Sequence, residues 1–324
     1  MTRKGALAGC LLAAGTPAVA QAQRAARVEL PIRAVTLTDG VRRYSVTIAI
    51  GGKAVEAGLD TGSTGLRVLP AALPQDVASA QGAPTRYHYG SGVLFAGATV
   101  TAQLSFGAMV GKAKIARIDQ IGCVERQPDC PAAAISPASY GILGDGLAGQ
   151  GFQAIVGIGF ASDPIPNPLI AIGVERWIVE LPRPGDIAPG RLILNPAENE
   201  VARYKQFDLM KGGNLIAGCI VAEQSTRKLC APAILDSGAN GLRVQGGKPD
   251  DVLPQGTPAL LTIGDRAGTV SMPVVIGSRD QAAGMRLYPP RDAGGLTFNF
   301  GIAPYFRWSV LYNARDHRIG IAER

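Results

Sequence analysis

The chain has 324 residues, of which 47% are hydrophobic and 18% charged, enough to bury the core of one large domain or of two ordinary ones. Its 42 Gly and 23 Pro are spread along the chain, which excludes a helix-dominated protein and favours many short strands and turns. The net charge of +7 comes from scattered Lys and Arg without a basic stripe, so we expect no nucleic-acid partner.

The first 22 residues have the pattern of a signal peptide rather than of folded structure. Basic residues at 3–4 precede an apolar run over 6–14, and Ala20 and Ala22 each offer a cleavage site. This run is too short to span a membrane, and no later stretch is long enough. Cys10 ends a lipoprotein-like sequence, but almost no apolar region precedes it, so lipid attachment is not favoured. We expect an exported protein, periplasmic or secreted.

Most of the remaining chain has a strand pattern. Residues 43–50 alternate and end at Gly51-Gly52, as the first strand of a hairpin does. Residues 55–59 form an apolar strand, and residues 99–107 alternate again. Helical signal is weak everywhere, and only residues 169–178, which follow a Pro-rich run, are predicted as a short helix.

The four cysteines that follow the leader fall into two close pairs. An even number of cysteines in an oxidising compartment is typical of disulfides, and we predict that Cys123 bonds to Cys130 and Cys219 to Cys230. A zinc site would need shorter spacing or partner histidines, and the only two histidines lie far apart in sequence. No metal or cofactor is expected.

The most informative feature is an internal repeat. Residues 59–68 read Leu-Asp-Thr-Gly-Ser-Thr-Gly-Leu-Arg-Val and residues 235–244 read Leu-Asp-Ser-Gly-Ala-Asn-Gly-Leu-Arg-Val, with seven of ten positions identical. The aspartates at positions 60 and 236 lie 176 residues apart, too far for a short solenoid repeat. The repeat predicts two lobes with one copy each, over residues 23–195 and 196–324.

The repeated motif has a chemical logic. Glycine permits a tight turn that presents the preceding aspartate, so two facing turns would bring Asp60 and Asp236 together, braced by the hydroxyls of Thr61 and Ser237. Like charges at that distance cannot both ionise, so the pair shares one proton. Such a pair can take a proton from water while it donates another to a carbonyl oxygen. Asp60 and Asp236 are therefore the predicted catalytic residues.

At these residues the chain resembles the pepsin family of aspartic peptidases. The resemblance extends over residues 89–92, 97–107, 154–160, 190–194 and 300–322, and so over nearly the whole chain beyond the leader. It implies an all-β fold of two barrel-like lobes with a cleft between them, and endopeptidase activity. We expect a monomer that takes a peptide or protein substrate.

The resemblance also assigns roles to neighbours of the two aspartates. The residues that support the two turns would be Thr61, Gly62, Ser63, Ser237 and Gly238. Among them, Ser63 would donate a hydrogen bond to the first carboxylate. A flap that closes over the bound peptide would contain Tyr89, Gly90 and Ser91.

Two positions depart from the family pattern. Arg67 replaces a tryptophan that commonly supports the flap tyrosine, and Ala239 stands where a hydroxyl often donates to Asp236. A lost donor to the charged form should raise the pKa of Asp236, which predicts activity in mildly acidic to near-neutral conditions. Arg67 and Arg243, which the repeat places at equivalent positions, are expected to be structural or solvent-facing.

Two other classes of function stay open. A non-catalytic peptide- or protein-binding protein on the same scaffold would fit the departures at Arg67 and Ala239, although the intact Asp60 and Asp236 argue against it. A structural protein of the cell envelope, whose lobes serve assembly, is the second alternative.

Overall fold

The computed structural model describes residues 26–210, 213–223, 227–265, 268–289 and 295–324, and Met1. The predicted signal peptide, apart from Met1, lies outside these ranges, and so does Cys10. Within the described residues, no helix is long and apolar enough to cross a membrane.

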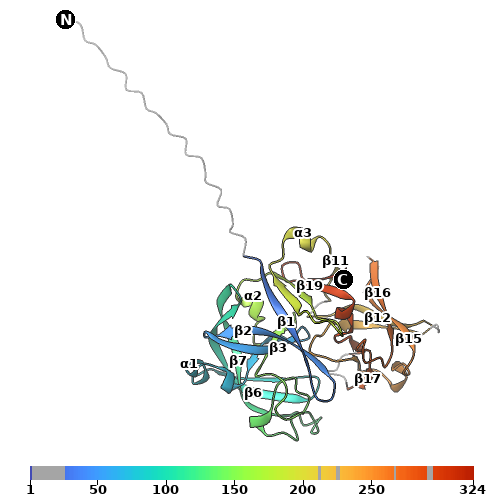
Figure 1. Ribbon diagram of the computed structural model, residues 1–324, viewed down its shortest axis with the longest axis horizontal. Helices are drawn as coiled ribbons and strands as arrows, with labels where there is room; N and C mark the ends of the chain where they lie inside the picture. Colours follow the sequence, from blue (N-terminus) through green and yellow to red (C-terminus); the bar gives the residue numbers. More distant parts are fainter. Residues whose placement is uncertain (2–25, 211–212, 224–226, 266–267, 290–294) are drawn as a thin grey trace.

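Two sheets dominate the described residues (Figure 1). The larger sheet has 13 strands in the order β11 (Lys205–Asp208), β20 (Arg318–Glu323), β19 (Trp308–Asn313), β9 (Arg176–Glu180), β10 (Gly190–Leu194), β1 (Val28–Thr36), β2 (Arg42–Ile50), β3 (Lys53–Asp60), β8 (Ala154–Ile158), β4 (Thr64–Val68), β7 (Met109–Cys123), β6 (Val93–Phe106) and β5 (Ala83–His88).

The smaller sheet has seven strands in the described part of the chain. Their order is β16 (Gly268–Val275), β15 (Pro258–Asp265), β12 (Ile216–Ala222), β13 (Lys228–Ile234), β18 (Thr297–Asn299), β14 (Leu242–Gln245) and β17 (Met285–Tyr288). The α-helices that the described ranges contain have four residues each: α1 (Gln75–Ala78), α2 (Pro168–Ala171) and α3 (Glu198–Val201). The prediction of an all-β protein is confirmed.

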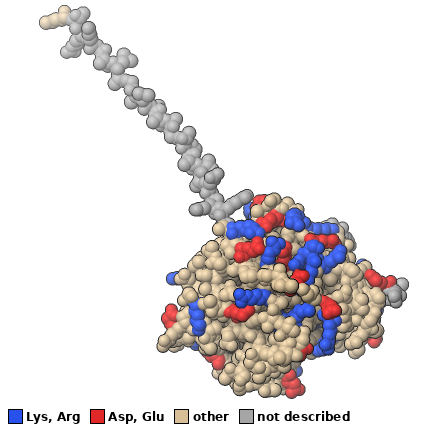
Figure 2. Space-filling model, in the orientation of Figure 1, with Lys and Arg blue, Asp and Glu red and all other residues tan. Residues whose placement is uncertain are grey.

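The strands form two lobes that share one sheet. In Figure 1, β2, β3, β6 and β7 lie on one side of the molecule, and β12, β15, β16 and β17 lie on the other. Between them, β19 from the end of the chain pairs with β9, and β9 continues through β10 to β1. Strands from both predicted halves of the chain therefore tie the lobes together. Charges of both signs are interspersed over the face that Figure 2 shows.

The predicted hairpin near the start of the chain is confirmed. β2 buries Ile48 and Ile50 and pairs antiparallel with β3. The turn falls at Gly51 and Gly52, whose φ angles of 55° and 83° lie in the left-handed region that favours glycine. The strand predicted over residues 99–107 belongs to the longer β6.

The helix predicted over residues 169–178 is wrong beyond its first turn. The Asn167 side chain caps α2 by accepting hydrogen bonds from two of its backbone N–H groups, but Gly173 at a φ of 88° ends the helical conformation. The chain then enters β9, where Trp177 is fully buried. Burial of one aromatic and two β-branched side chains in a central strand outweighs the weak helical pattern.

Both predicted disulfides are present. Cys123 at the end of β7 is bonded to Cys130, and Cys219 faces its partner Cys230 across β12 and β13. The bonds close short loops, with sequence separations of 7 and 11 residues. Cys130 lies against Gly92, so the first disulfide fixes a segment that contacts the turn between β5 and β6.

Removal of a disulfide should lower the free energy of unfolding and leave the fold unchanged. For loops this short, the lost constraint on the unfolded chain predicts about 2–3 kcal/mol for the double variant Cys219→Ser, Cys230→Ser. Urea denaturation of the variant and the wild type measures the difference. The matched variant Cys123→Ser, Cys130→Ser should lose a similar amount, and two variants as stable as wild type would contradict the prediction.

Candidate active site

The two repeated turns occupy matching positions in the strand arrangement. Asp60 ends β3, and the neighbouring β8 pairs parallel with β3 and antiparallel with β4. Asp236 follows β13, and its neighbour β18 pairs parallel with β13 and antiparallel with β14. In both places the chain turns at the aspartate, and the strands before and after the turn pair with opposite edges of the same middle strand, which is β8 in one case and β18 in the other. The sequence repeat is thus also a structural repeat.

Glycine allows the two turns to approach each other closely. A Cβ atom at Gly62 would lie 2.3 Å from the carboxyl carbon of Asp236, and one at Gly238 would lie 2.8 Å from Oδ1 of Asp60. No side chain tolerates such contacts, so these two positions require glycine. The side chains of Asp60 and Asp236 line one cleft and are only 4% and 9% exposed.

Each carboxyl group accepts one backbone and one side-chain hydrogen bond. The N–H group two residues after each aspartate donates to its Oδ1 at 2.8 Å. Ser63 Oγ donates to Oδ2 of Asp60 at 2.5 Å, and Asn299 Nδ2 donates to Oδ2 of Asp236 at the same distance. The two carboxyl groups therefore accept the same pattern of hydrogen bonds. Their side-chain donors differ, since one is a hydroxyl three residues after its aspartate and the other is an amide from a distant strand.

The donor that the sequence predicted to be missing at Asp236 is present, so the premise of that prediction is wrong. Ala239 carries no hydroxyl, but Asn299 at the end of β18 supplies the hydrogen bond. The Asn299 side chain is oriented in turn by Gly301, whose N–H donates to Oδ1 at 2.8 Å. The one available sequence signal was a polar residue between two buried phenylalanines.

Burial raises the pKa of Asp60 to about 7, and the negative charge of Asp236 adds to the rise. The hydrogen bonds from Ser63 and Gly62 lower it without cancelling these effects. A hydrogen bond from the protonated form of Asp60 to Asp236 raises this pKa further. In mildly acidic solution Asp60 therefore holds a proton.

Thr61 and Ser237 join the two turns by reciprocal hydrogen bonds. Oγ1 of Thr61 accepts from Ser237 N at 2.9 Å, and Oγ of Ser237 accepts from Thr61 N at 3.0 Å. The same hydroxyls donate across the junction, from Thr61 to Leu235 O at 3.0 Å and from Ser237 to Leu59 O at 2.7 Å. Because all these groups are buried, every bond satisfies a polar group that water cannot reach.

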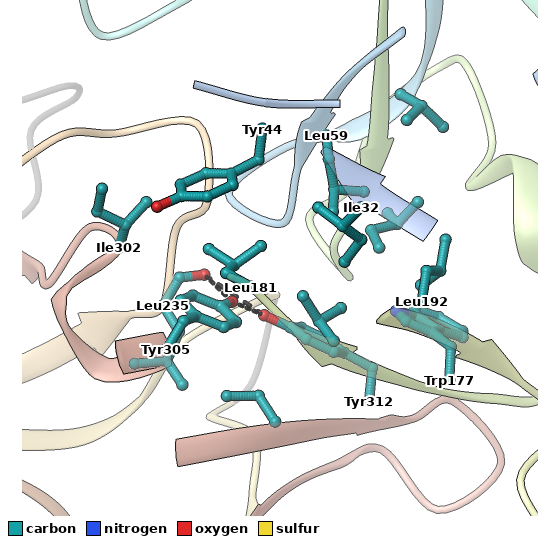
Figure 3. Close-up of a cluster of buried hydrophobic side chains, with 14 of the residues drawn as sticks. Ile32, Tyr44, Leu59, Trp177, Leu181, Leu192, Leu235, Ile302, Tyr305 and Tyr312 are labelled. Carbon is teal, nitrogen blue, oxygen red and sulfur yellow. Dashed lines mark hydrogen bonds between the residues drawn. The ribbon is translucent and has the colours of Figure 1, made fainter. Parts of the chain in front are cut away.

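Two buried tyrosines extend this network into the protein interior (Figure 3). Tyr305 OH lies 2.7 Å from Oγ1 of Thr61 and 2.5 Å from Tyr312 OH. The Thr61 hydroxyl donates to Leu235 O, and the hydroxyls of Tyr305 and Tyr312 also lie 3.4 and 3.5 Å from that oxygen. The ring of Tyr312 stacks on Trp177 at 5.8 Å between centroids. No local sequence pattern predicts this support.

Tyr89, Gly90 and Ser91 lie in the turn between β5 and β6 and line the cleft that contains the two aspartates. Tyr89 packs edge-to-face on Phe95, at 5.5 Å between ring centroids, and its hydroxyl is buried beside Ser63. Burial raises the pKa of this hydroxyl well above its usual value, so it stays neutral. The hairpin therefore reaches over the carboxyl pair.

Of the two roles expected for Arg67, the structure shows the structural one. Its side chain is 1% exposed, donates to Thr64 O at 2.7 Å and forms a buried ion pair with Asp163 at 2.5 Å. The guanidinium carbon lies 3.5 Å from the ring centroid of Tyr87, two residues before Tyr89. The hairpin is thus supported by a paired cation in place of an aromatic ring.

No protein-family model matches the chain, and no curated protein matches it. Among solved structures, it is similar to an aspartic proteinase from Irpex lacteus, with a TM-score of 0.59 and 16% sequence identity, over 92% of this chain and 97% of that one. The chain has the pepsin-like two-lobed fold. At 16% identity this similarity shows the fold alone.

Other site residues were missed by sequence reasoning. Arg43 on β2 spans the lobes, since Nη1 donates to Gly238 O at 2.9 Å while the rest of the guanidinium binds Leu143 O and Asp145. Asp145 adopts a φ of 52° and lines the cleft. Asn214 Nδ2 donates to the backbone of Thr61 at 2.6 Å. These contacts join segments that are distant in sequence, so no local sequence pattern predicts them.

Removal of the reciprocal hydrogen bonds should lower the free energy of unfolding, and the effects of the two substitutions should not be additive. Thr61→Val and Ser237→Ala each leave buried backbone groups unpaired, so each should lower the free energy of unfolding by about 1–3 kcal/mol. Because both substitutions remove the same junction, the double variant should lose less than the sum. Denaturant titrations of the four proteins measure the coupling. Thr262→Val, which removes an exposed hydroxyl pair with Ser271, is the control and should change stability by less than about 0.5 kcal/mol. Additive losses would contradict the prediction.

Proposed function

We propose that this protein is an aspartic endopeptidase that hydrolyses peptide bonds between Asp60 and Asp236. The observation that carries the proposal is the buried carboxyl pair in an inter-lobe cleft, with the pKa of Asp60 raised to about 7 by burial and by the neighbouring charge. A pair that shares one proton at mildly acidic pH contains a general base and a general acid side by side. The pepsin-like fold is a further argument for this activity.

The reaction follows from the proton that the pair shares. The ionised carboxylate takes a proton from water as the water oxygen attacks the peptide carbonyl carbon. The protonated carboxyl group gives its proton to the carbonyl oxygen, so a neutral tetrahedral diol forms. The protonated carboxyl group then gives its proton to the amide nitrogen while the ionised one takes a proton from a hydroxyl of the diol. The C–N bond breaks to give a carboxylic acid and an amine, and the pair again holds one proton. No step requires a metal or cofactor.

The substrate would bind as an extended chain between the hairpin turn and the two aspartates. Gly90 and Ser91 line the cleft opposite the carboxyl pair and would offer backbone groups to the peptide. Tyr89 would pack over the residue at the scissile bond. Residues 23–195 and 196–324 would form the two walls of the cleft.

We place the activity outside the cytoplasm. Two disulfides are typical of proteins that fold in an oxidising compartment. With the predicted leader over residues 1–22, they favour a periplasmic or secreted enzyme, which we propose acts as a monomer.

Replacement of either aspartate tests the assignment directly. Asp60→Asn and Asp236→Asn remove the base-and-acid pairing with almost no change in shape, so kcat/KM should fall by about 10³-fold or more. Hydrolysis of a mixed peptide library measures the loss, and thermal unfolding checks that both variants are folded. Asp76→Asn, which makes the same chemical change at an exposed position in α1, is the matched control and should keep the wild-type kcat/KM. A protein that binds peptides but cleaves none at any pH would be a binding protein on this scaffold.

The raised pKa of Asp60 predicts the alkaline limit of activity. Below a pKa of about 7 the pair keeps its shared proton, and above it both groups ionise and the general acid is lost, so kcat/KM should fall as pH rises through about 7. Asn299→Ala and Ser63→Ala each remove a donor to the charged form. Both should move this limb upward, by about one pH unit or less. A limb that stays in place in both variants would mean that these donors do not govern the shared proton.

A further inference from the structure

The internal repeat places two arginines at equivalent positions, and their surroundings differ. Arg67 on β4 is neutralised by Asp163, and both side chains are almost fully buried. Arg243 on β14 is partly exposed and lines the cleft that contains the two aspartates. Within the described ranges, no carboxylate forms an ion pair with Arg243 and no hydrogen bond occupies its guanidinium.

The other cation of the cleft is not available in the same way. Arg43 is held by Asp145, Leu143 O and Gly238 O, so its donors are used within the protein. The guanidinium of Arg243 is instead fixed by a ring, since its central carbon lies 4.9 Å from the centroid of Tyr288. Stacking on an aromatic face orients the guanidinium plane and leaves its edge free to donate.

A second arginine lies beside the first. β14 and β17 pair in parallel with Arg243 opposite Arg286, and Tyr288 follows two residues later, so the three side chains share one face of the sheet. Arg286 is exposed and likewise forms no ion pair among the residues that the structure describes. Two like charges directly opposite each other on neighbouring strands repel, and an anion between them removes that repulsion. This site is therefore suited to an anion.

We infer that Arg243, assisted by Arg286, binds a carboxylate of the peptide substrate. The cleft then selects peptides with an acidic group a few residues from the cleaved bond. A guanidinium forks onto a carboxylate through two N–H donors, which gives both affinity and a defined register of the peptide. The net charge of +7, of which the predicted leader contributes only Arg3 and Lys4, also favours encounter with acidic peptides. The inference rests on the proposed endopeptidase activity, whose substrate it narrows.

The test compares glutamate with its neutral isostere. A peptide that the enzyme cleaves is synthesised as Glu and Gln pairs at each of the four positions on either side of the scissile bond, with both ends blocked. At one position, kcat/KM for Glu should exceed that for Gln by about tenfold or more, and the ratio should fall at high salt. In Arg243→Gln the ratio should drop to about one, and in Arg286→Gln it should be only partly reduced. A parallel series with a free carboxyl terminus shows whether a side chain or the chain end supplies the carboxylate.

The control is Arg315→Gln, which removes one charge from an exposed turn between β19 and β20 and should keep the wild-type ratio. A ratio near one at every position in both series, or a ratio that persists in Arg243→Gln, overturns the inference and leaves the protease assignment intact. If no peptide is cleaved, the proposed function fails. The inference is then decided by the affinity of wild type and Arg243→Gln for the same Glu and Gln peptides, measured by fluorescence anisotropy, where equal affinities overturn it.

Discussion

The geometry of the molecule depends on holding two acidic side chains against each other where water is largely excluded. Burial and repulsion from the charge of Asp236 oppose ionisation of Asp60 and raise its pKa to about 7. The reciprocal hydrogen bonds of Thr61 and Ser237 keep the turns together despite this repulsion. They can do so because glycine at the next position of each motif leaves room for the opposing carboxyl group. The shared sheet of β1, β9, β10 and β19 then fixes the lobes on which the turns sit.

The two lobes share the backbone arrangement around their aspartate turns, but individual side chains in that arrangement differ. β3, β8 and β4 have the same mutual arrangement as β13, β18 and β14, so each motif reaches its turn in the same way. Their side-chain donors then diverge, with Ser63 three residues from its aspartate and Asn299 on a strand 63 residues away. The equivalent arginines differ as well, since Arg67 forms a buried ion pair and Arg243 lines the cleft. Symmetry of the fold therefore does not require symmetry of function between the lobes.

How far the sequence could predict this structure depended on the range of the interactions involved. The hairpin at Gly51-Gly52, both disulfides and the all-β class followed from local patterns that the structure confirms. The two aspartate turns could be paired only because the repeat is long and nearly identical. The helix over residues 169–178 failed because burial of Trp177 in a central strand is a tertiary effect. Asn299 was missed for the same reason, since a donor brought in by a distant strand has no fixed spacing from its acceptor.

The prediction from Ala239 was wrong because the absence of a hydroxyl in the motif does not mean that Asp236 lacks a hydrogen-bond donor. A buried carboxylate without a hydrogen-bond donor lowers the free energy of unfolding by about 1–3 kcal/mol or more. A donor from another part of the chain removes this cost. Here the shared neighbour β18 runs between the strands that flank Asp236, and its last residue is within reach of Oδ2. The equivalent strand β8 ends near Asp60, where Ser63 already donates. The repeated architecture thus offers two routes to the same hydrogen bond, and each lobe uses a different one.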